Sequence, residues 1–354
     1  MREVDWLAGI VTGIATALVA LMPQDAAACS RVVYLGPDNT VITARSMDWK
    51  EDIRSNIWVF PRGMERASES GPNSMRWTSI HGSVITSGYE AATTDGMNEK
   101  GLVTSLLWLA ESEYPTDPGE RKTLAISLWA QYVLDRFATV AEAVDALERE
   151  EFVVVTDETP GGTGIGLATL HLAISDASGD SAIFEYIDGE LVIHHGREYQ
   201  VMTNSPTYDK QLALYEYWQE IGGTTMLPGT NRAADRFARA SFYVNAIPQV
   251  SDPRLAVASM FSVIRNVSVP LGISTPYQPN ISSTQWRTVA DHKNRVYYYE
   301  SALSPNTFWL AFDGIDFSPA AGVRKLSVIH QEVYSGDAVG ELATAEPFEF
   351  MGID

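Results

Sequence analysis

An apolar leader ends at the only cysteine of this 354-residue sequence, and this junction limits what the chain can become. A single cysteine excludes an intramolecular disulfide, so the position of Cys29 reflects packing, lipid attachment or chemistry. The run from Trp6 to Met22 is short for a membrane span, and Ala26 and Ala28 are the small residues that a signal peptidase requires. We therefore expect residues 1–28 to be a signal peptide whose removal makes Cys29 the first residue of the mature chain.

A cysteine at an amino terminus carries a nucleophile and a base on one residue. The ordinary pKa is about 8.5 for the thiol and about 7.7–8.0 for the α-amine, so near neutral pH the amine can accept the thiol proton. The alternative is a lipoprotein, in which this cysteine is acylated and only anchors the chain. Such signals prefer a leucine-like residue where Ala26 stands. The leader alone leaves both interpretations open.

Size and charge narrow the class of protein. Removing the leader leaves 326 residues, and no linker, low-complexity tract or repeat divides them, so we expect one domain over residues 29–354. The leader contains one arginine and three carboxylates, so its loss changes the formal charge from −20 to −18. A surface this acidic repels phosphate backbones and anionic lipids. We expect no nucleic-acid or membrane binding, and a soluble protein that is periplasmic or secreted.

The first mature segments predict a hairpin. Ser30–Leu35 is a short β-type run that ends at a Gly-Pro-Asp-Asn turn, and residues 40–46 form the returning strand. Antiparallel pairing from this turn brings Arg45 beside Cys29, to within one or two residues, with Asp48 just beyond. A surface ion pair of Arg45 and Asp48 would contribute little. The hairpin geometry instead favours a role for both side chains in a site.

The rest of the chain alternates blocks of strands with blocks of helices. Strands are predicted over residues 56–60, 82–87, 101–108, 152–156, 167–172, 181–186, 190–193, 286–290, 296–299 and 307–310, with a turn over residues 95–101. Helical spacing is present over residues 124–134, 140–147, 208–221, 232–245 and 255–264. Because βαβ units are absent from this order, we expect a layered α+β fold.

Several common site signatures are missing from the sequence. The six histidines show no metal-ligand spacing, and the adjacent His194 and His195 would face opposite sides of a strand. The glycine-rich run over residues 160–166 matches neither a dinucleotide nor a phosphate-loop pattern and is expected to be a flexible loop. A G-x-S-x-G nucleophile elbow is also missing. Cys29 therefore remains the principal candidate for catalytic chemistry, and no metal or cofactor is expected.

Two further polar residues are candidates for a site. Asn204 follows a predicted strand and precedes a predicted helix, where its amide N–H can donate to a developing oxyanion, although Asn-Ser-Pro is also an ordinary helix-start signal. Arg236 lies on a predicted helix and by itself is typical of a solvated arginine.

Taken together, these segments resemble the choloylglycine hydrolase family of N-terminal nucleophile hydrolases, which contains penicillin V acylases and conjugated bile acid hydrolases. The motifs that carry the resemblance appear in the family's order: Cys29 and residues 44–49, 95–102, 203–207 and 235–237. Residues 45–50, 107–114 and 227–237 are most similar to Gram-negative penicillin V acylases. The resemblance covers essentially the whole mature chain.

The resemblance implies a four-layer αββα sandwich and an amidase mechanism. Cys29 would attack the amide carbonyl while its α-amine handles the proton, and Asp48 would hold and orient that amine. Arg45 and Arg236 would stabilise the thiolate and the polar network around it, and Asn204 would donate to the oxyanion. A thioester would form and water would release the acid. Family members are commonly homotetramers, which implies self-association.

One position departs from the Gram-positive members. Trp108 stands where they have Asn or Tyr, and an indole can donate a hydrogen bond but cannot accept one. We therefore expect a backbone N–H as the second oxyanion donor. Trp49 and Trp108 are candidates for stacking on an apolar acyl group, or they are ordinary core tryptophans.

The principal hypothesis is an exported cysteine amidase that acts on a small-molecule amide, the side chain of penicillin V. Conjugated bile salts and N-acyl homoserine lactones are alternative substrates. A non-catalytic, lipid-anchored ligand-binding protein is the alternative of a different class.

Overall fold

The computed structural model describes residues 29–149, 151–160, 166–222, 225–274, 281–304, 306–330 and 332–353. The predicted signal peptide over residues 1–28 and residues 161–165 of the glycine-rich run lie outside the described residues.

Two large, mostly antiparallel sheets form the centre of the protein. Within the described residues, one sheet has seven strands in the order β14-β1-β2-β15-β16-β17-β19. Their bounds are Val201–Met202, Ser30–Leu35, Val41–Trp49, Ser283–Asp291, Val296–Ser301, Thr307–Ala311 and Gly336–Asp337. The other sheet, counted in the same way, has nine strands in the order β13-β12-β11-β8-β7-β6-β3-β18-β20. Their bounds are Glu190–His195, Ser181–Ile187, Leu170–Ser175, Val103–Trp108, Ala92–Asn98, Ser83–Gly88, Ile57–Phe60, Arg324–Leu326 and Ala343–Thr344.

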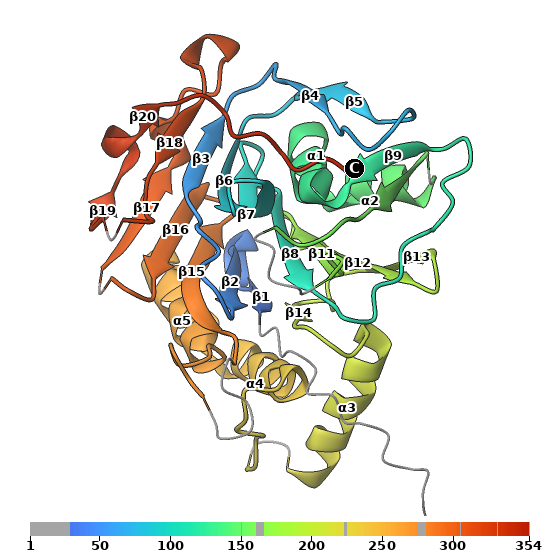
Figure 1. Ribbon diagram of the computed structural model, residues 1–354. Helices are drawn as coiled ribbons and strands as arrows, with labels where there is room; N and C mark the ends of the chain where they lie inside the picture. The colour runs from blue at the N-terminus through green and yellow to red at the C-terminus, as the bar shows by residue number, and fades with distance from the viewer. Residues whose placement is uncertain are drawn as a thin grey trace, which may run out of the picture.

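Helices cover the outer face of each sheet. Helices α4 (Ala233–Ala246) and α5 (Pro253–Asn266) pack on β1, β2 and β15, while α1 (Trp129–Arg136) and α2 (Val140–Glu148) pack on the other sheet (Figure 1). Helix α3 (Tyr208–Ile221) lies beside α4. The main hydrophobic core contains residues from the facing strands of both sheets. This arrangement confirms the α+β sandwich of four layers.

Small additions flank the nine-stranded sheet. Strands β4 (Glu65–Ala67) and β5 (Arg76–Thr78) form one antiparallel pair, and β9 (Lys122–Ala125) and β10 (Phe152–Val155) form a parallel pair. Two of the helices, α5 and α2, begin at a capping side chain. Asp252 accepts from two backbone N–H groups at the start of α5, with Pro253 in the first turn, and Thr139 accepts from one at the start of α2.

The N-terminal hairpin forms within the predicted range of register, with Arg45 opposite Arg31, two residues from Cys29. Leu35 pairs with Val41, and Ser30 therefore pairs with Ser46. The turn between the strands places Asp38 and Asn39 at positive φ, a conformation that these residue types tolerate best among non-glycine residues. Because β15 pairs with the other edge of β2, the returning strand is covered on both sides. Pairing on both edges holds the end of β2 in place next to Cys29.

Three predicted elements are wrong in whole or in part. Residues 95–98, predicted as part of a turn, belong to strand β7. The turn itself covers only residues 98–101 and is closed by the hydrogen bond from the Gly101 N–H to the Asn98 carbonyl. The predicted helix over 124–134 begins as β9 and a 3₁₀ turn (Ile126–Leu128), because the backbone of residues 122–125 pairs with β10. The strand predicted over 167–172 is β11, which begins at Leu170. The other predicted helices agree to within two residues at each end.

Candidate active site

Cys29 lies at the start of β1, against the end of β2. Its side chain is buried, with 3% of the residue exposed. The Asp48 backbone N–H donates to Sγ at 3.5 Å, and Met47 Sδ lies 3.7 Å from Sγ. Burial raises the pKa of the Cys29 thiol, and the positive charge of Arg45 and the Asp48 N–H oppose this rise only in part. In this environment the thiol requires a nearby base to become a thiolate.

The Asp48 carboxyl group is held inside the seven-stranded sheet. Its Oδ1 accepts a hydrogen bond from the Thr284 hydroxyl on β15, and its Oδ2 accepts one from Ser46 Oγ at 3.2 Å. Burial raises the pKa of Asp48 to about 6, although Arg236 and both hydroxyl donors favour the charged form. Thr284 was not among the predicted site residues, since no motif in its own segment points to a role.

Arg236 projects from α4 and connects two of the predicted site residues. Its Nη1 donates to the Cys29 carbonyl at 2.5 Å and to Ser30 Oγ at 2.6 Å, and its Nη2 donates to Asn204 Oδ1 at 2.9 Å. Burial lowers the pKa of Arg236 to about 10, so the guanidinium remains charged at neutral pH. Arg236 is fully buried, so its interpretation as a solvated arginine is wrong.

The Asn204 amide is fixed at both ends. Its oxygen accepts from Arg236, and its Nδ2 donates to the Trp108 carbonyl at 2.7 Å. Gln211 on α3 donates to the Asn204 backbone carbonyl at 2.9 Å. An amide N has two hydrogens, so one N–H of Asn204 remains for an oxyanion after the contact with Trp108 is made.

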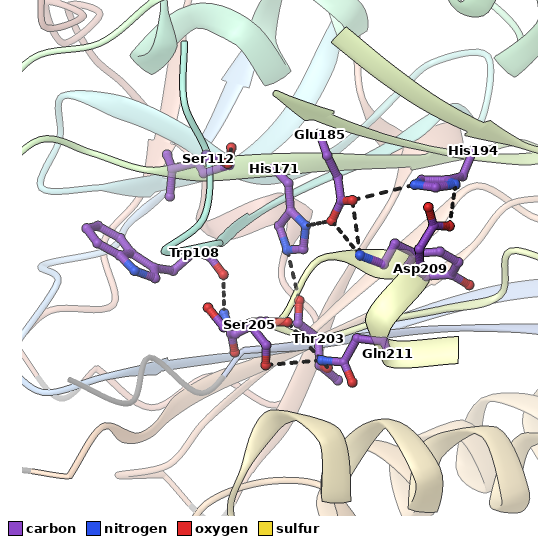
Figure 2. A network of polar contacts seen from close by, with 12 residues as sticks. Trp108, Ser112, His171, Glu185, His194, Thr203, Ser205, Asp209 and Gln211 are labelled. Carbon is purple, nitrogen blue, oxygen red and sulfur yellow. Dashed lines mark hydrogen bonds and ion pairs between the residues drawn. The ribbon is translucent and has the colours of Figure 1, made fainter. Parts of the chain in front are cut away.

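A buried network supports the segment that contains Asn204. Figure 2 shows His171 between Glu185 and this segment: Nδ1 lies 3.2 Å from Glu185 Oε1, and Nε2 lies 2.8 Å from the Thr203 carbonyl. The Tyr208 N–H donates to both Glu185 oxygens at 3.1 Å. Burial alone would raise the pKa of Glu185, but the hydrogen bonds from His171, His194 and Tyr208 lower it to about 2. None of these residues has sequence spacing that reveals the network.

Arg45 lies one step further from the thiol than the hairpin alone suggests. Its Nη2 donates to the Leu106 carbonyl at 2.8 Å and lies 3.9 Å from Met47 Sδ, so Met47 stands between Arg45 and Cys29. The guanidinium carbon is 4.8 Å from the ring centre of Trp286, a cation–π contact.

Asp95 is the buried counter-charge of Arg45. Its Oδ1 lies 3.9 Å from Arg45 Nη1 and accepts from Ser105 Oγ at 2.7 Å. Its Oδ2 accepts from Thr288 Oγ1 at 2.8 Å and from the Tyr297 hydroxyl at 2.6 Å. Burial raises the pKa of Asp95, and Arg45 opposes that rise. The turn predicted over residues 95–101 includes Asp95 and did not indicate this pairing.

An apolar cavity of about 100 Å³ opens beside the thiol. Trp49 and Trp108 both line it, and their ring centres are 5.4 Å apart with the planes tilted by 48°. Trp49 Nε1 donates to the Tyr89 hydroxyl at 2.7 Å, which fixes that indole. The cavity is also lined by Cys29, Met47, Ile53, Leu106, Ile126, Ser127, Ala168, Leu170 and Met351, among others.

The described residues contain no group of three or more His, Cys, Asp or Glu side chains placed to hold a metal ion. His194 is largely buried against Glu185, while His195 contacts Asp180 at 2.9 Å and is more exposed. The two rings thus face opposite sides of β13, as predicted. In the part of the chain that the structure describes, no helix is long and apolar enough to span a bilayer.

Comparison with known proteins places the chain in a family. Residues 29–317 match the family model of linear amide C–N hydrolases, choloylglycine hydrolase family. The chain is 53% identical over 368 residues to a penicillin V acylase of Pectobacterium atrosepticum, with 97% of each chain covered. The structure of penicillin V acylase from Agrobacterium tumefaciens superposes with a TM-score of 0.85 at 61% identity, covering 92% of this chain and all of that one.

A more distant structure has the same fold. A variant of the conjugated bile acid hydrolase from Clostridium perfringens superposes with a TM-score of 0.73 at 21% identity, over 87% of this chain and 98% of that one. The fold is that of the N-terminal nucleophile hydrolases, the class to which these structural relatives belong. The chain belongs to the choloylglycine hydrolase family, which confirms the resemblance seen in the sequence. It is a hydrolase of linear amide C–N bonds in small molecules.

Proposed function

We propose that this chain is an exported amidase whose nucleophile is Cys29, freed as an amino terminus by removal of residues 1–28. The observation that carries the proposal is the position of Sγ, which lines the apolar cavity and lies beside Asp48 and Arg236. The fully buried Asp48 carboxylate suits a partner for the α-amine, since a buried carboxylate is stabilised by a nearby cation.

The proposed reaction begins with proton transfer from the Cys29 thiol to its own α-amine. Sγ then forms a bond to the amide carbonyl carbon, and the second N–H of Asn204 donates to the resulting oxyanion. The C–N bond breaks as the protonated α-amine returns its proton to the leaving nitrogen, which gives a thioester. Water, deprotonated by the same amine, attacks the thioester carbonyl carbon. The C–S bond breaks, the Cys29 sulfur takes the proton back from the α-amine, and the carboxylic acid leaves.

The need for the α-amine follows from the burial of the thiol. Because burial raises the thiol pKa, Cys29 is protonated at neutral pH without a base. An α-amine with an ordinary pKa of about 7.7–8.0 is a suitable acceptor. Arg236 contributes to the reaction by donating hydrogen bonds to the Cys29 carbonyl and to Asn204. These bonds fix the position of the nucleophile relative to the oxyanion donor. Arg45 acts through charge, across Met47.

The proposed substrate is penicillin V, whose acyl group is a single phenoxy ring on a short linker. Two relatives that are more than half identical to this chain are penicillin V acylases. An apolar cavity of about 150 Å³ binds benzene in another protein, so a cavity of about 100 Å³ is on the scale of one ring. Trp49 and Trp108 offer aromatic faces to that ring.

Release of 6-aminopenicillanic acid from penicillin V by the chain that begins at Cys29 tests the proposal. A chain that retains Ala28 is the matched control, because it has the same thiol but its Cys29 nitrogen is an amide. We expect turnover with the first chain and none with the second or with Cys29→Ala. Full activity of the Ala28-retaining chain would refute the role of the amine. No turnover of penicillin V, with hydrolysis of bile salts or acyl homoserine lactones instead, would refute the substrate.

Export and self-association are further parts of the proposal, supported by the leader pattern and by the family. Cell fractionation and the mass of the mature protein test the export: we expect an unmodified chain starting at Cys29 in the periplasm or medium. A lipid-modified Cys29 would favour the anchored binding protein instead. Light scattering tests self-association, for which a tetramer is expected.

A further inference from the structure

The last residues of the chain reach the acyl cavity. The C-terminal tail crosses from β20 to end beside α1 and β9 (Figure 1). Met351 lines the same cavity as Cys29, Trp49 and Trp108. The match to the family model ends at residue 317, so this part of the wall comes from outside the matched segment.

Hydrogen bonds fix the tail at the cavity wall. The Met351 N–H donates to the Ala91 carbonyl at 2.9 Å, and Ser127 Oγ donates to the Met351 carbonyl at 2.6 Å. The Ile353 N–H donates to the Glu69 carbonyl at 2.9 Å. Ser127 lines the cavity itself, so the donor and the tail residue that it holds belong to one wall.

Aromatic packing anchors the tail before it reaches the cavity. The Phe348 ring centre lies 5.3 Å from that of Trp58 and 5.8 Å from that of Phe60. Phe350 packs on Phe60 at 6.3 Å, and the Arg66 guanidinium lies 5.2 Å from the Phe350 ring centre. Met351 is therefore held on both sides along the chain, and its position at the cavity is determined by the fold.

We propose that Met351 determines which acyl groups the enzyme accepts, by closing one wall of the acyl cavity. The inference rests on the proposed function and adds a specificity-determining residue to it. Methionine is unbranched and flexible, so it fills an irregular gap and leaves a larger space when it is shortened. In a small apolar pocket, one methylene of substrate changes discrimination by about 10- to 200-fold. Shortening Met351 is thus expected to change the preference for acyl length.

The test compares kcat/KM for a series of N-acyl derivatives of 6-aminopenicillanic acid, from butanoyl to decanoyl and including phenoxyacetyl. The leaving amine is constant, so differences report on the acyl group. For Met351→Ala we expect the ratio of decanoyl to butanoyl kcat/KM to rise at least about tenfold. For Met351→Phe we expect that ratio to fall. Met226→Ala is the matched control, since Met226 is exposed and is not among the residues that line the cavity.

A second variant moves the tail without changing a lining residue. A Cβ at Gly352 would lie 2.7 Å from the Glu69 carbonyl oxygen, which is too close, so Gly352→Val displaces the tail from this wall. We expect it to shift the acyl preference in the same direction as Met351→Ala. Folded variants are identified by their thermal unfolding.

The outcomes separate this inference from the proposed function. Wild-type protein that hydrolyses none of the series would refute both. Active wild-type protein whose acyl preference is unchanged in Met351→Ala, Met351→Phe and Gly352→Val would refute the role of Met351 alone. Opposite shifts in the alanine and phenylalanine variants would support it.

Discussion

If Asn204 donates to the oxyanion, its removal should lower kcat by a predictable factor. Asn204→Ala removes an amide that is held between Arg236 at 2.9 Å and the Trp108 carbonyl at 2.7 Å. Loss of one oxyanion donor typically lowers kcat by about 10²- to 10³-fold, or about 2.7–4 kcal/mol. The variant also leaves a buried donor and a buried acceptor unpaired, each costing about 1–3 kcal/mol of stability. We therefore expect a large loss of kcat, little change in KM and a lower melting temperature.

Asn204→Asp separates the donor from the shape of the side chain. The carboxylate keeps the contact with Arg236, but an oxygen then faces the Trp108 carbonyl and the developing oxyanion. We expect a loss of kcat at least as large as for alanine. The assay is penicillin V hydrolysis at saturating substrate, with thermal unfolding to verify the folded state. Asn245→Ala is the control, because Asn245 is an exposed asparagine on α4 with one bond to the Ser241 carbonyl. Asn204→Ala with kcat within about threefold of wild type would refute the role of Asn204.

Three further predictions concern the groups around the thiol. The proposed mechanism needs a neutral α-amine, whose ordinary pKa is about 7.7–8.0, and a charged Asp48, whose pKa burial raises to about 6. We therefore expect kcat/KM to decline below about pH 8 and to decline more steeply below about pH 6, and a rate that is flat from pH 5 to 8 would argue against this. Arg236→Gln should lower the free energy of unfolding in urea by about 3–5 kcal/mol and should also lower kcat. The substitution leaves the buried Cys29 carbonyl and Asn204 Oδ1 without their cationic donor, so stability equal to wild type would contradict these contacts. Asp95→Asn should lower the free energy of unfolding by about 3 kcal/mol by leaving the buried charge of Arg45 without a counter-charge, and a loss below about 1 kcal/mol would show that the hydroxyl donors alone hold this site.

Local sequence signals were sufficient to predict the part of the site that the hairpin builds. A turn signal and two β-type runs determine the register of β1 against β2, and that register places Ser46 opposite Ser30 and Asp48 next to Cys29. The reason is physical: antiparallel pairing from a short turn leaves little freedom for slippage when both strands are buried. Asn204 and Arg236 needed the resemblance to the family, because each lies far from Cys29 in the sequence.

The features that the sequence did not predict depend on packing between segments that lie far apart in the chain. Asp95 stands at the start of a segment that contains the turn-forming residues glycine and asparagine. Pairing with β6 and β8 nevertheless extends strand β7 through Asp95 and buries its carboxyl group. Residues 124 and 125 were predicted to start a helix, but they belong to strand β9. Their partner strand β10 lies about thirty residues later in the chain, so local spacing could not indicate this pairing. Met351 carries no motif, and its place in the cavity follows from aromatic anchors and hydrogen bonds with distant segments. Such contacts have no periodic signal in the sequence.

In the proposed mechanism, the substrate acylates Cys29 as a free amino terminus. The most direct measurement is mass spectrometry of the mature enzyme quenched by acid soon after mixing with penicillin V, followed by peptide mapping. We expect a phenoxyacetyl group in thioester linkage on a peptide that begins at Cys29, and its loss on longer incubation. An acyl group on another residue, or a peptide whose amino terminus precedes Cys29 in active enzyme, would contradict this mechanism.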